Sequence, residues 1–114
     1  MTATILVADD EIPIAELLAD LLEEVGYHVI LAYNGADALH LLEHERPDLL
    51  VTDNMMPRLN GLQLIAHLQQ HATLTIPVIL MSAVRPEQYP AVPFVSKPFD
   101  LNHMLALVTK LLPA

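Results

Sequence analysis

The stretch Ile5-Leu6-Val7-Ala8-Asp9-Asp10 is the part of the sequence that decides the fold. Four apolar residues in a row, without polar alternation, indicate a short strand that is buried on both of its faces. Strands of that kind occur in parallel sheets, because crossover helices cover both faces of such sheets. The two aspartates would then lie at the carboxyl end of a buried strand.

A helical pattern follows this strand, and the alternation of strand and helix repeats along the chain. Gly26 stands where a left-handed residue commonly ends a helix, and Asn34 can cap the next helix, which must end before Pro47. Further strands are predicted at 27–33, 49–51, 76–81 and 94–95, and further helices at 61–71 and 101–112. The first helix has one apolar stripe that we expect to face inward: Ile14, Leu17, Leu18, Leu21, Leu22 and Val25.

Five strands that alternate with helices predict an α/β fold with a single doubly wound, five-stranded parallel sheet. The common order for such a sheet is 2-1-3-4-5, as in flavodoxin-like folds. The connection between Ser82 and Phe94 departs from this pattern, because its 11 residues include three prolines. A parallel crossover usually needs about a dozen residues and a helix, and Pro90 would break a helix here. We therefore expect a shortened or missing fourth helix.

Composition excludes several classes of protein. The 114 residues suffice for one domain, 1–114, and the absence of cysteine excludes a disulfide scaffold, a cysteine nucleophile and a zinc–thiolate site. Fourteen acidic residues against five lysines and arginines argue against direct binding to nucleic acid. The uncharged stretch 59–84 contains polar residues, and no basic residue precedes the first apolar run. We therefore expect no membrane span, no secretory signal and a cytoplasmic location.

Polar residues stand just past four predicted strand ends: Asp9 and Asp10, then Asp53, Ser82 and Lys97. In an open α/β sheet these ends share one edge, and ligands bind where the strand order reverses, here between strands 1 and 3. Three aspartates held close repel one another, and Mg²⁺ offsets such repulsion while leaving room for a phosphate oxygen. Lys97 supplies a positive charge and Ser82 a hydroxyl donor. This set predicts phosphoryl transfer, in which a carboxylate can be the nucleophile.

These residues resemble the receiver domain of two-component response regulators, the CheY-like family. The resemblance covers essentially the whole chain. Four segments carry it, in order and on the expected strand ends: Asp9-Asp10-Glu11, Asp53-Asn54-Met55-Met56-Pro57-Arg58-Leu59-Asn60-Gly61, Ser82-Ala83 and Lys97-Pro98-Phe99. Each segment is a weak marker alone, and the combination is specific.

The resemblance implies a phosphorylation-dependent switch rather than an enzyme with a substrate of its own. Asp53 would accept a phosphoryl group from the phosphohistidine of a sensor histidine kinase or a phosphotransfer protein. Asp10, Asp53 and the backbone carbonyl of Met55 would ligate Mg²⁺, with Asp9 acting through water. The domain would contribute to its own phosphorylation and dephosphorylation. A downstream target, or an output domain outside this chain, would receive the signal.

The resemblance also implies the moving parts of the switch. Ser82 would turn toward the phosphoryl group, Lys97 would pair with it, and Phe94 would turn inward as the switch aromatic. The bond between Lys97 and Pro98 is often cis in this family. Met55 and Val84 would border the path of the hydrolytic water, so two apolar side chains there predict a long-lived phosphorylated state.

The connection between Ser82 and Phe94 is short, and the missing length falls on a helix that many regulators use to report phosphorylation. The sequence therefore does not assign the output surface of this chain. The weakly charged region 59–96 is our candidate for a protein contact surface, including a homodimer. A rival function is a phosphorylation-independent interaction module, for which the short connection is the support. A hydrolytic phosphatase on the same acidic edge would need a substrate-binding insertion or cap, and none is visible.

Several residues also have plainer interpretations. Asp10 could cap the first helix, and Phe94 could be an ordinary core aromatic. Two histidine pairs stand at i, i+4, His40/His44 and His67/His71. A histidine metal site is conceivable there, and we interpret both pairs as solvated helix faces. Met55 and its neighbour Met56 are interpreted as loop packing rather than a soft-metal site.

Overall fold

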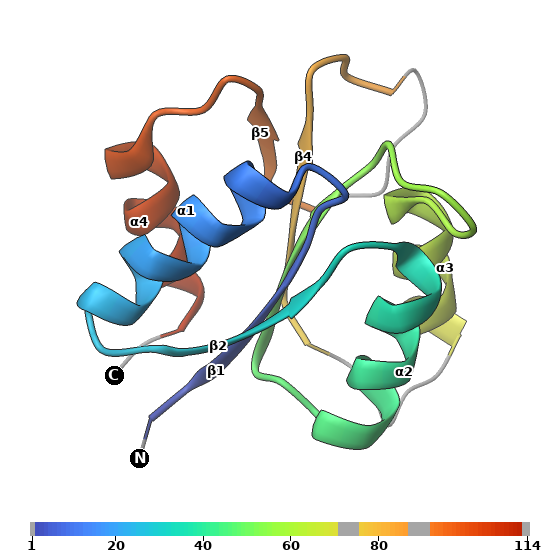
Figure 1. The fold of residues 1–114 in the computed structure, drawn as a ribbon, viewed down its shortest axis with the longest axis horizontal. Coiled ribbons are helices and arrows are strands. Elements are labelled where there is room, and N and C mark those ends of the chain that lie inside the picture. Colours follow the sequence, from blue (N-terminus) through green and yellow to red (C-terminus); the bar gives the residue numbers. More distant parts are fainter. Residues whose placement is uncertain (1, 71–75, 87–91, 113–114) are drawn as a thin grey trace.

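A computed structural model of the chain describes residues 2–70, 76–86 and 92–112. The elements follow one another in the order β1 (Thr4–Ala8), α1 (Ile12–Glu24), β2 (His28–Ala32), α2 (Gly35–Glu45), β3 (Leu49–Asp53), α3 (Gly61–Gln70), β4 (Val78–Ser82), β5 (Phe94–Ser96) and α4 (Leu101–Leu111). The strands form one parallel sheet in the order β2-β1-β3-β4-β5 (Figure 1). The predicted fold class and strand order are therefore confirmed. None of the helices in these described ranges is long and apolar enough to span a membrane.

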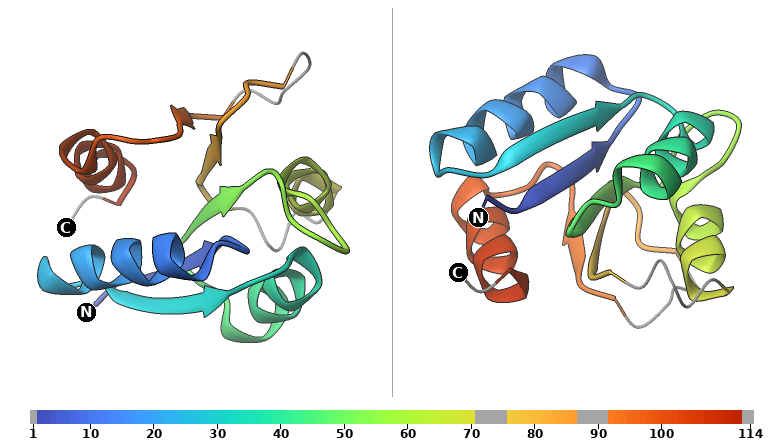
Figure 2. Two further views of the ribbon diagram at one scale, coloured as in Figure 1. Left: turned by 45° about the horizontal axis from the view of Figure 1, so that its top comes forward. Right: turned by 90° about the horizontal axis from the view of Figure 1, so that it is seen from below.

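The sheet divides the molecule into three layers. Helices α1 and α4 cover one face, and α2 and α3 cover the other (Figures 1 and 2). Because successive side chains of a strand point to opposite faces, Ile5 and Val7 of β1 join the first core cluster and Leu6 and Ala8 join the second. Each buried aliphatic side chain of this kind stabilises the fold by about 1.5–3 kcal/mol. The apolar run of β1 thus supplies both cores at once.

Several element boundaries agree with the sequence and others need correction. The Asn34 side chain accepts a hydrogen bond from the Asp37 amide and caps α2, and Gly26 has a positive φ of 104°. However, Glu11 is the N-cap of α1, so the interpretation of Asp10 as that cap is wrong. Leu17 and Val25 are 52% and 54% exposed, because α1 buries a narrower stripe: Ala15, Leu18, Ala19 and Leu22.

The limits of all five strands shift by one or two residues, so that β1 begins at Thr4 and β3 ends at Asp53. β2 ends at Ala32, one residue before the predicted limit, and β4 begins at Val78 and includes Ser82. β5 extends to Ser96. Helix α3 is described to Gln70, and the predicted last residue of that helix, His71, lies outside the described residues.

The connection between β4 and β5 contains no helix in its described residues, 83–86 and 92–93. The expectation of a shortened or missing fourth helix agrees with this, and the rest of the connection, 87–91, lies outside the described residues.

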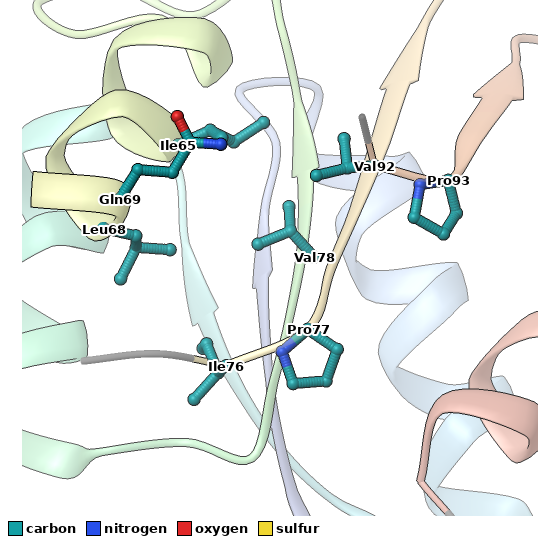
Figure 3. A pocket seen from close by; sticks show the side chains of 8 residues that line it. All are labelled: Ile65, Leu68, Gln69, Ile76, Pro77, Val78, Val92 and Pro93. Carbon is teal, nitrogen blue, oxygen red and sulfur yellow. The ribbon is translucent and has the colours of Figure 1, made fainter. Parts of the chain in front are cut away.

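A hollow of about 230 Å³ lies between α3 and the segments that lead into β4 and β5 (Figure 3). Its lining is apolar apart from one glutamine: Ile65, Leu68, Gln69, Ile76, Pro77, Val78, Val92 and Pro93.

Candidate functional site

The carboxyl ends of β1, β3 and β5 bring three charged side chains together, although two of them are 88 positions apart in the sequence. The Lys97 Nζ atom lies 2.7 Å from Asp9 Oδ2 and 3.5 Å from Asp53 Oδ2. Asp9 and Asp53 are buried, and only 9% of the Lys97 side chain is exposed. The sequence-based expectation that these residues share one edge is confirmed.

Backbone hydrogen bonds continue the sheet past the strand ends and thereby position these side chains. The Lys97 amide donates to the Ser82 carbonyl at 2.9 Å, and the Asp9 amide donates to the Ala32 carbonyl at 3.0 Å. Ser82 is buried, and its Oγ accepts a hydrogen bond from the Val84 amide at 3.3 Å. The peptide bond between Lys97 and Pro98 is cis, as the family resemblance implies.

The loop between β3 and α3 is built tightly against Asp53. A Cβ atom on Gly61 would lie 2.6 Å from the Asp53 carbonyl oxygen, so a larger residue would push the loop away. Asn54 ties the loop to the start of α3, because its carbonyl accepts a hydrogen bond from the Gly61 amide. Asn60 and Gln63 form a reciprocal capping pair at that helix start. These contacts hold the end of β3, and with it Asp53, in a fixed position.

Burial and nearby negative charge together determine the electrostatics of the site. The pKa of the Asp53 carboxyl is raised from 3.8 to about 6, chiefly by burial and also by the negative charges of Asp9 and Asp10, against the lowering effect of Lys97. For Lys97, burial by itself lowers the pKa of the ammonium. The hydrogen bonds to Asp9 and Glu11, together with the negative charges of Asp9 and Asp53, outweigh burial, so the net shift of that pKa is upward. Lys97 therefore stays positively charged at neutral pH, and it does not fully neutralise its surroundings.

The chemistry of these donors fits a hard divalent cation. Asp9, Asp10 and Asp53 each offer a carboxylate oxygen, and these oxygens all lie within 4.8 Å of one another. Asp10 is exposed and the other two are buried. Carboxylate oxygens are the ligands that Mg²⁺ prefers. A cation here would offset the repulsion that keeps the pKa of Asp53 high.

Two residues implied by the resemblance lie at the rim rather than in the cluster. The Met55 side chain is 70% exposed, and the role implied for this residue belongs to its backbone carbonyl. Phe94 is half-buried against the second core cluster, and the guanidinium carbon of Arg85 lies 5.0 Å from its ring centroid. The structure places Phe94 on β5, three residues before Lys97.

One site residue was missed by the sequence reasoning. The Glu11 carboxylate oxygen Oε1 lies 3.1 Å from Lys97 Nζ, while the Glu11 amide donates to Asp9 Oδ1 at 2.9 Å. The segment Asp9-Asp10-Glu11 was recognised as a family marker, but its third residue was given no role. The spacing i, i+2 on a bend could have indicated it, because such residues can point to the same side.

Comparison with known proteins places these observations in a family. The family model "Response regulator receiver domain" matches residues 5–109. The chain belongs to the response regulator receiver family. Receiver domains of two-component response regulators act in phosphorylation-dependent signalling, and in general they are not enzymes.

Curated relatives extend this result. Over 98% of the chain, it is 37% identical to the alkaline phosphatase synthesis transcriptional regulatory protein PhoP of Bacillus subtilis, covering 49% of that protein. It is 36% identical to the response regulator MprA of Mycobacterium bovis over 98% of the chain and 51% of that protein. The chain thus spans about half the length of the curated relatives it matches.

Solved structures agree with the fold. The signal receiver domain of a histidine kinase from Syntrophus aciditrophicus has a TM-score of 0.90 at 32% identity, covering 96% of this chain and 89% of that chain. The receiver domain of the Francisella response regulator 1452 has a TM-score of 0.86 at 29% identity, covering 96% of both chains.

Proposed function

We propose that Asp53 is the phosphoacceptor of this receiver domain and that its phosphorylation changes a partner-binding surface. One observation carries the proposal. Asp53 is a buried carboxylate at a strand end, with the Lys97 ammonium 3.5 Å away and two further aspartates within 4.8 Å. A nucleophile, a fixed positive charge and a set of cation ligands are the parts that phosphoryl transfer needs.

The transfer would take place from a phosphohistidine of a sensor histidine kinase or a phosphotransfer protein. A carboxylate oxygen of Asp53 attacks the phosphorus atom, an O–P bond forms, and the N–P bond to the donor imidazole breaks. The imidazole nitrogen leaves with the electron pair and takes up a proton. Because its pKa is about 6, Asp53 is mostly ionised at pH 7 and above, which the attack requires.

Mg²⁺ is the proposed cofactor, and the residues that would hold it are Asp10, Asp53 and the Met55 carbonyl, with Asp9 acting through water. When bound, the ion supplies positive charge for the phosphoryl oxygens. Lys97 would pair with a phosphoryl oxygen, since its ammonium already lies between Asp9 and Asp53. These same groups would serve the domain in its own phosphorylation and dephosphorylation.

The proposed switch runs from Ser82 to Phe94. Ser82 would donate its hydroxyl to the phosphoryl group, which would draw in the segment after β4. Residues Val84 and Arg85 belong to that segment, and Arg85 already contacts the Phe94 ring. A movement of this segment would therefore change the contact between Arg85 and the Phe94 ring, and Phe94 would turn inward.

The proposed partners are proteins. A hollow of about 320 Å³ adjoins Lys97 and is lined mainly by apolar side chains: Ile14, Leu17, Pro98, Phe99 and Leu101. We expect a donor protein that reaches Asp53 to contact this hollow, because Lys97 lines the hollow and also lies next to Asp53. The weakly charged region 59–96 would contact a downstream protein or a second copy of the chain. Because the donor would be a sensor kinase or a phosphotransfer protein of a two-component system, the proposal also places the chain in the cytoplasm.

Intact mass spectrometry after incubation with acetyl phosphate and Mg²⁺ tests the proposal, with Asp53→Asn as the control. We expect a single phosphoryl adduct that requires Mg²⁺, is removed by hydroxylamine and is absent from the variant. If no adduct forms and beryllofluoride also fails to bind, the phosphoacceptor is wrong, and a phosphorylation-independent interaction module becomes the better explanation.

A further inference from the structure

The exposed surface of α2 carries a pair of histidines that the proposed function does not use. His40 and His44 are one helical turn apart, and their rings are stacked with centroids 4.0 Å apart and planes inclined by 28°. Both side chains are exposed. Residues at i and i+4 lie on the same helix face, so this arrangement follows from the sequence spacing and the helix.

A hydrogen bond determines which nitrogen of His44 can bind a ligand. His44 Nδ1 lies 2.8 Å from the carbonyl oxygen of His40. A carbonyl oxygen can only accept, so Nδ1 carries the hydrogen, and in the neutral ring the lone pair is on Nε2. Histidines that ligate metals in proteins commonly have this arrangement, because donation to a carbonyl fixes the tautomer and orients the ring.

We propose that His40 and His44 form a site for a divalent transition metal of the Zn²⁺, Cu²⁺ and Ni²⁺ class. Imidazole nitrogen suits these ions, whereas Mg²⁺ prefers the carboxylates at the sheet edge. Two nitrogens that bind one ion at about 2.0–2.1 Å must lie roughly 3 Å apart. The two rings are stacked in this structure, so the exposed His40 side chain has to rotate before a lone pair of each ring can point to one ion.

The site has two protein ligands. Among the described residues, only Asp9, Asp10 and Asp53 bring three ligating groups within 4.8 Å of one another. The nearby carboxylate of Glu43 on α2 lies 3.6 Å from His67 Nε2 on α3, so it pairs with that histidine rather than with the ion. Water fills the remaining coordination positions of the ion, and the ion links two successive turns of α2.

Isothermal titration of the chain with Cu²⁺ and Zn²⁺, in a large excess of Mg²⁺ to occupy the carboxylates, tests the site. We expect His40→Gln and His44→Gln each to weaken binding by about tenfold or more, because each leaves a single imidazole. The matched controls are His28→Gln and His103→Gln, which remove exposed histidines without a histidine partner one turn away, and they should bind as the unmodified chain does.

Thermal unfolding supplies a second readout that does not depend on the titration. In the same excess of Mg²⁺, Zn²⁺ should raise the Tm of the unmodified chain and of the two controls but not of His40→Gln or His44→Gln, since only a bound ion stabilises the folded state. All four variants change exposed side chains, so their metal-free Tm values should agree. Equal affinity in His44→Gln and the unmodified chain would overturn the site. An equally large loss in His67→Gln would also overturn it, because the ion would then lie between α2 and α3.

Discussion

The carboxyl edge of the sheet and the hollow beside the amino ends of β4 and β5 are two regions built on the same strands. At the carboxyl edge, buried Asp9, Asp53 and Ser82 lie in the interior of the protein. At the amino ends, the described residues that line the hollow are apolar apart from Gln69, and none of them is charged (Figure 3). Among the described residues, no buried side-chain nitrogen or oxygen lacks a hydrogen-bond partner.

The two regions should differ in how strongly they respond to substitution. The charged groups at the carboxyl edge, Asp9, Asp53 and Lys97, are paired across different strands, so removal of Lys97 leaves the two carboxylates buried without their counter-ion. The hollow has no such dependence, because its side chains are held by apolar contacts that are incomplete. Substitutions should therefore have large and specific effects at the edge and small effects beside the hollow.

The largest expected effect comes from removal of the positive charge at the edge. Lys97→Met should lower the free energy of unfolding by about 3 kcal/mol in metal-free buffer, because Asp9 and Asp53 lose their counter-ion in a buried site. Urea denaturation measures this, with Lys110→Met on the exposed side of α4 as the matched control. Added Mg²⁺ should recover part of the loss. If Lys97→Met and Lys110→Met lower the free energy of unfolding equally, the carboxyl edge is not especially sensitive to substitution.

A second test uses the pKa of Asp53. Because that pKa is about 6 when folded and 3.8 otherwise, the folded state holds a proton that the unfolded state lacks between these values. Metal-free stability should therefore fall as pH rises from about 4 to about 6, and then remain level. Asp53→Asn removes this dependence and should raise the free energy of unfolding at pH 7.5 by about 1–3 kcal/mol.

Thermal or urea unfolding across this pH range measures the effect of Asp53→Asn. The stabilities of the two proteins should converge as the pH falls toward and below 3.8, where the carboxyl group becomes protonated in both states. If the gain in the free energy of unfolding of Asp53→Asn persists unchanged at pH 4, the charge of Asp53 is not its cause. The destabilising effect of the buried carboxyl edge would then need another explanation.

The third prediction compares one added methylene in each region. Val78→Ile adds volume beside the hollow and should stabilise the chain by about 0.5–1 kcal/mol. Val7→Ile adds the same volume to the fully packed core of β1 and should destabilise it by about 1–3 kcal/mol. Urea midpoints of both variants decide the matter. A loss of stability in Val78→Ile as large as that in Val7→Ile would mean that the hollow is already filled.

The smallest expected effect concerns the rim of the edge. Met55 and Val84 are 70% and 74% exposed, so replacing them should leave stability within about 0.5 kcal/mol. Met55→Asn with Val84→Glu should speed loss of the phosphoryl group severalfold, since the apolar side chains would no longer hinder water. The decay of the phosphorylated protein, followed by mass spectrometry, measures this rate. An unchanged rate of dephosphorylation would show that Met55 and Val84 do not determine the lifetime of the phosphorylated state.

Local sequence patterns were sufficient for much of the fold and for bringing Asp9, Asp53, Ser82 and Lys97 to one edge of the sheet, but not for Glu11. The unbroken apolar run of residues 5–8 indicated a strand buried on both faces, and the Asn34 cap and the Gly26 helix end followed from local stereochemistry. The inward placement of Leu17 failed because the periodic pattern is wider than the stripe that the sheet can cover. Burial is set by the neighbouring elements, which periodicity does not contain.

By itself, the sequence determined the α/β alternation, the polar residues at the strand ends and the short connection before Phe94, since these depend on residue types and spacing. Only the tertiary structure decided that Glu11 reaches Lys97, that burial and the neighbouring carboxylates raise the pKa of Asp53, and that a hollow lies beside Val78. The physical reason is that distances between residues far apart in the chain, and the burial that strengthens charge, arise only when the strands pair.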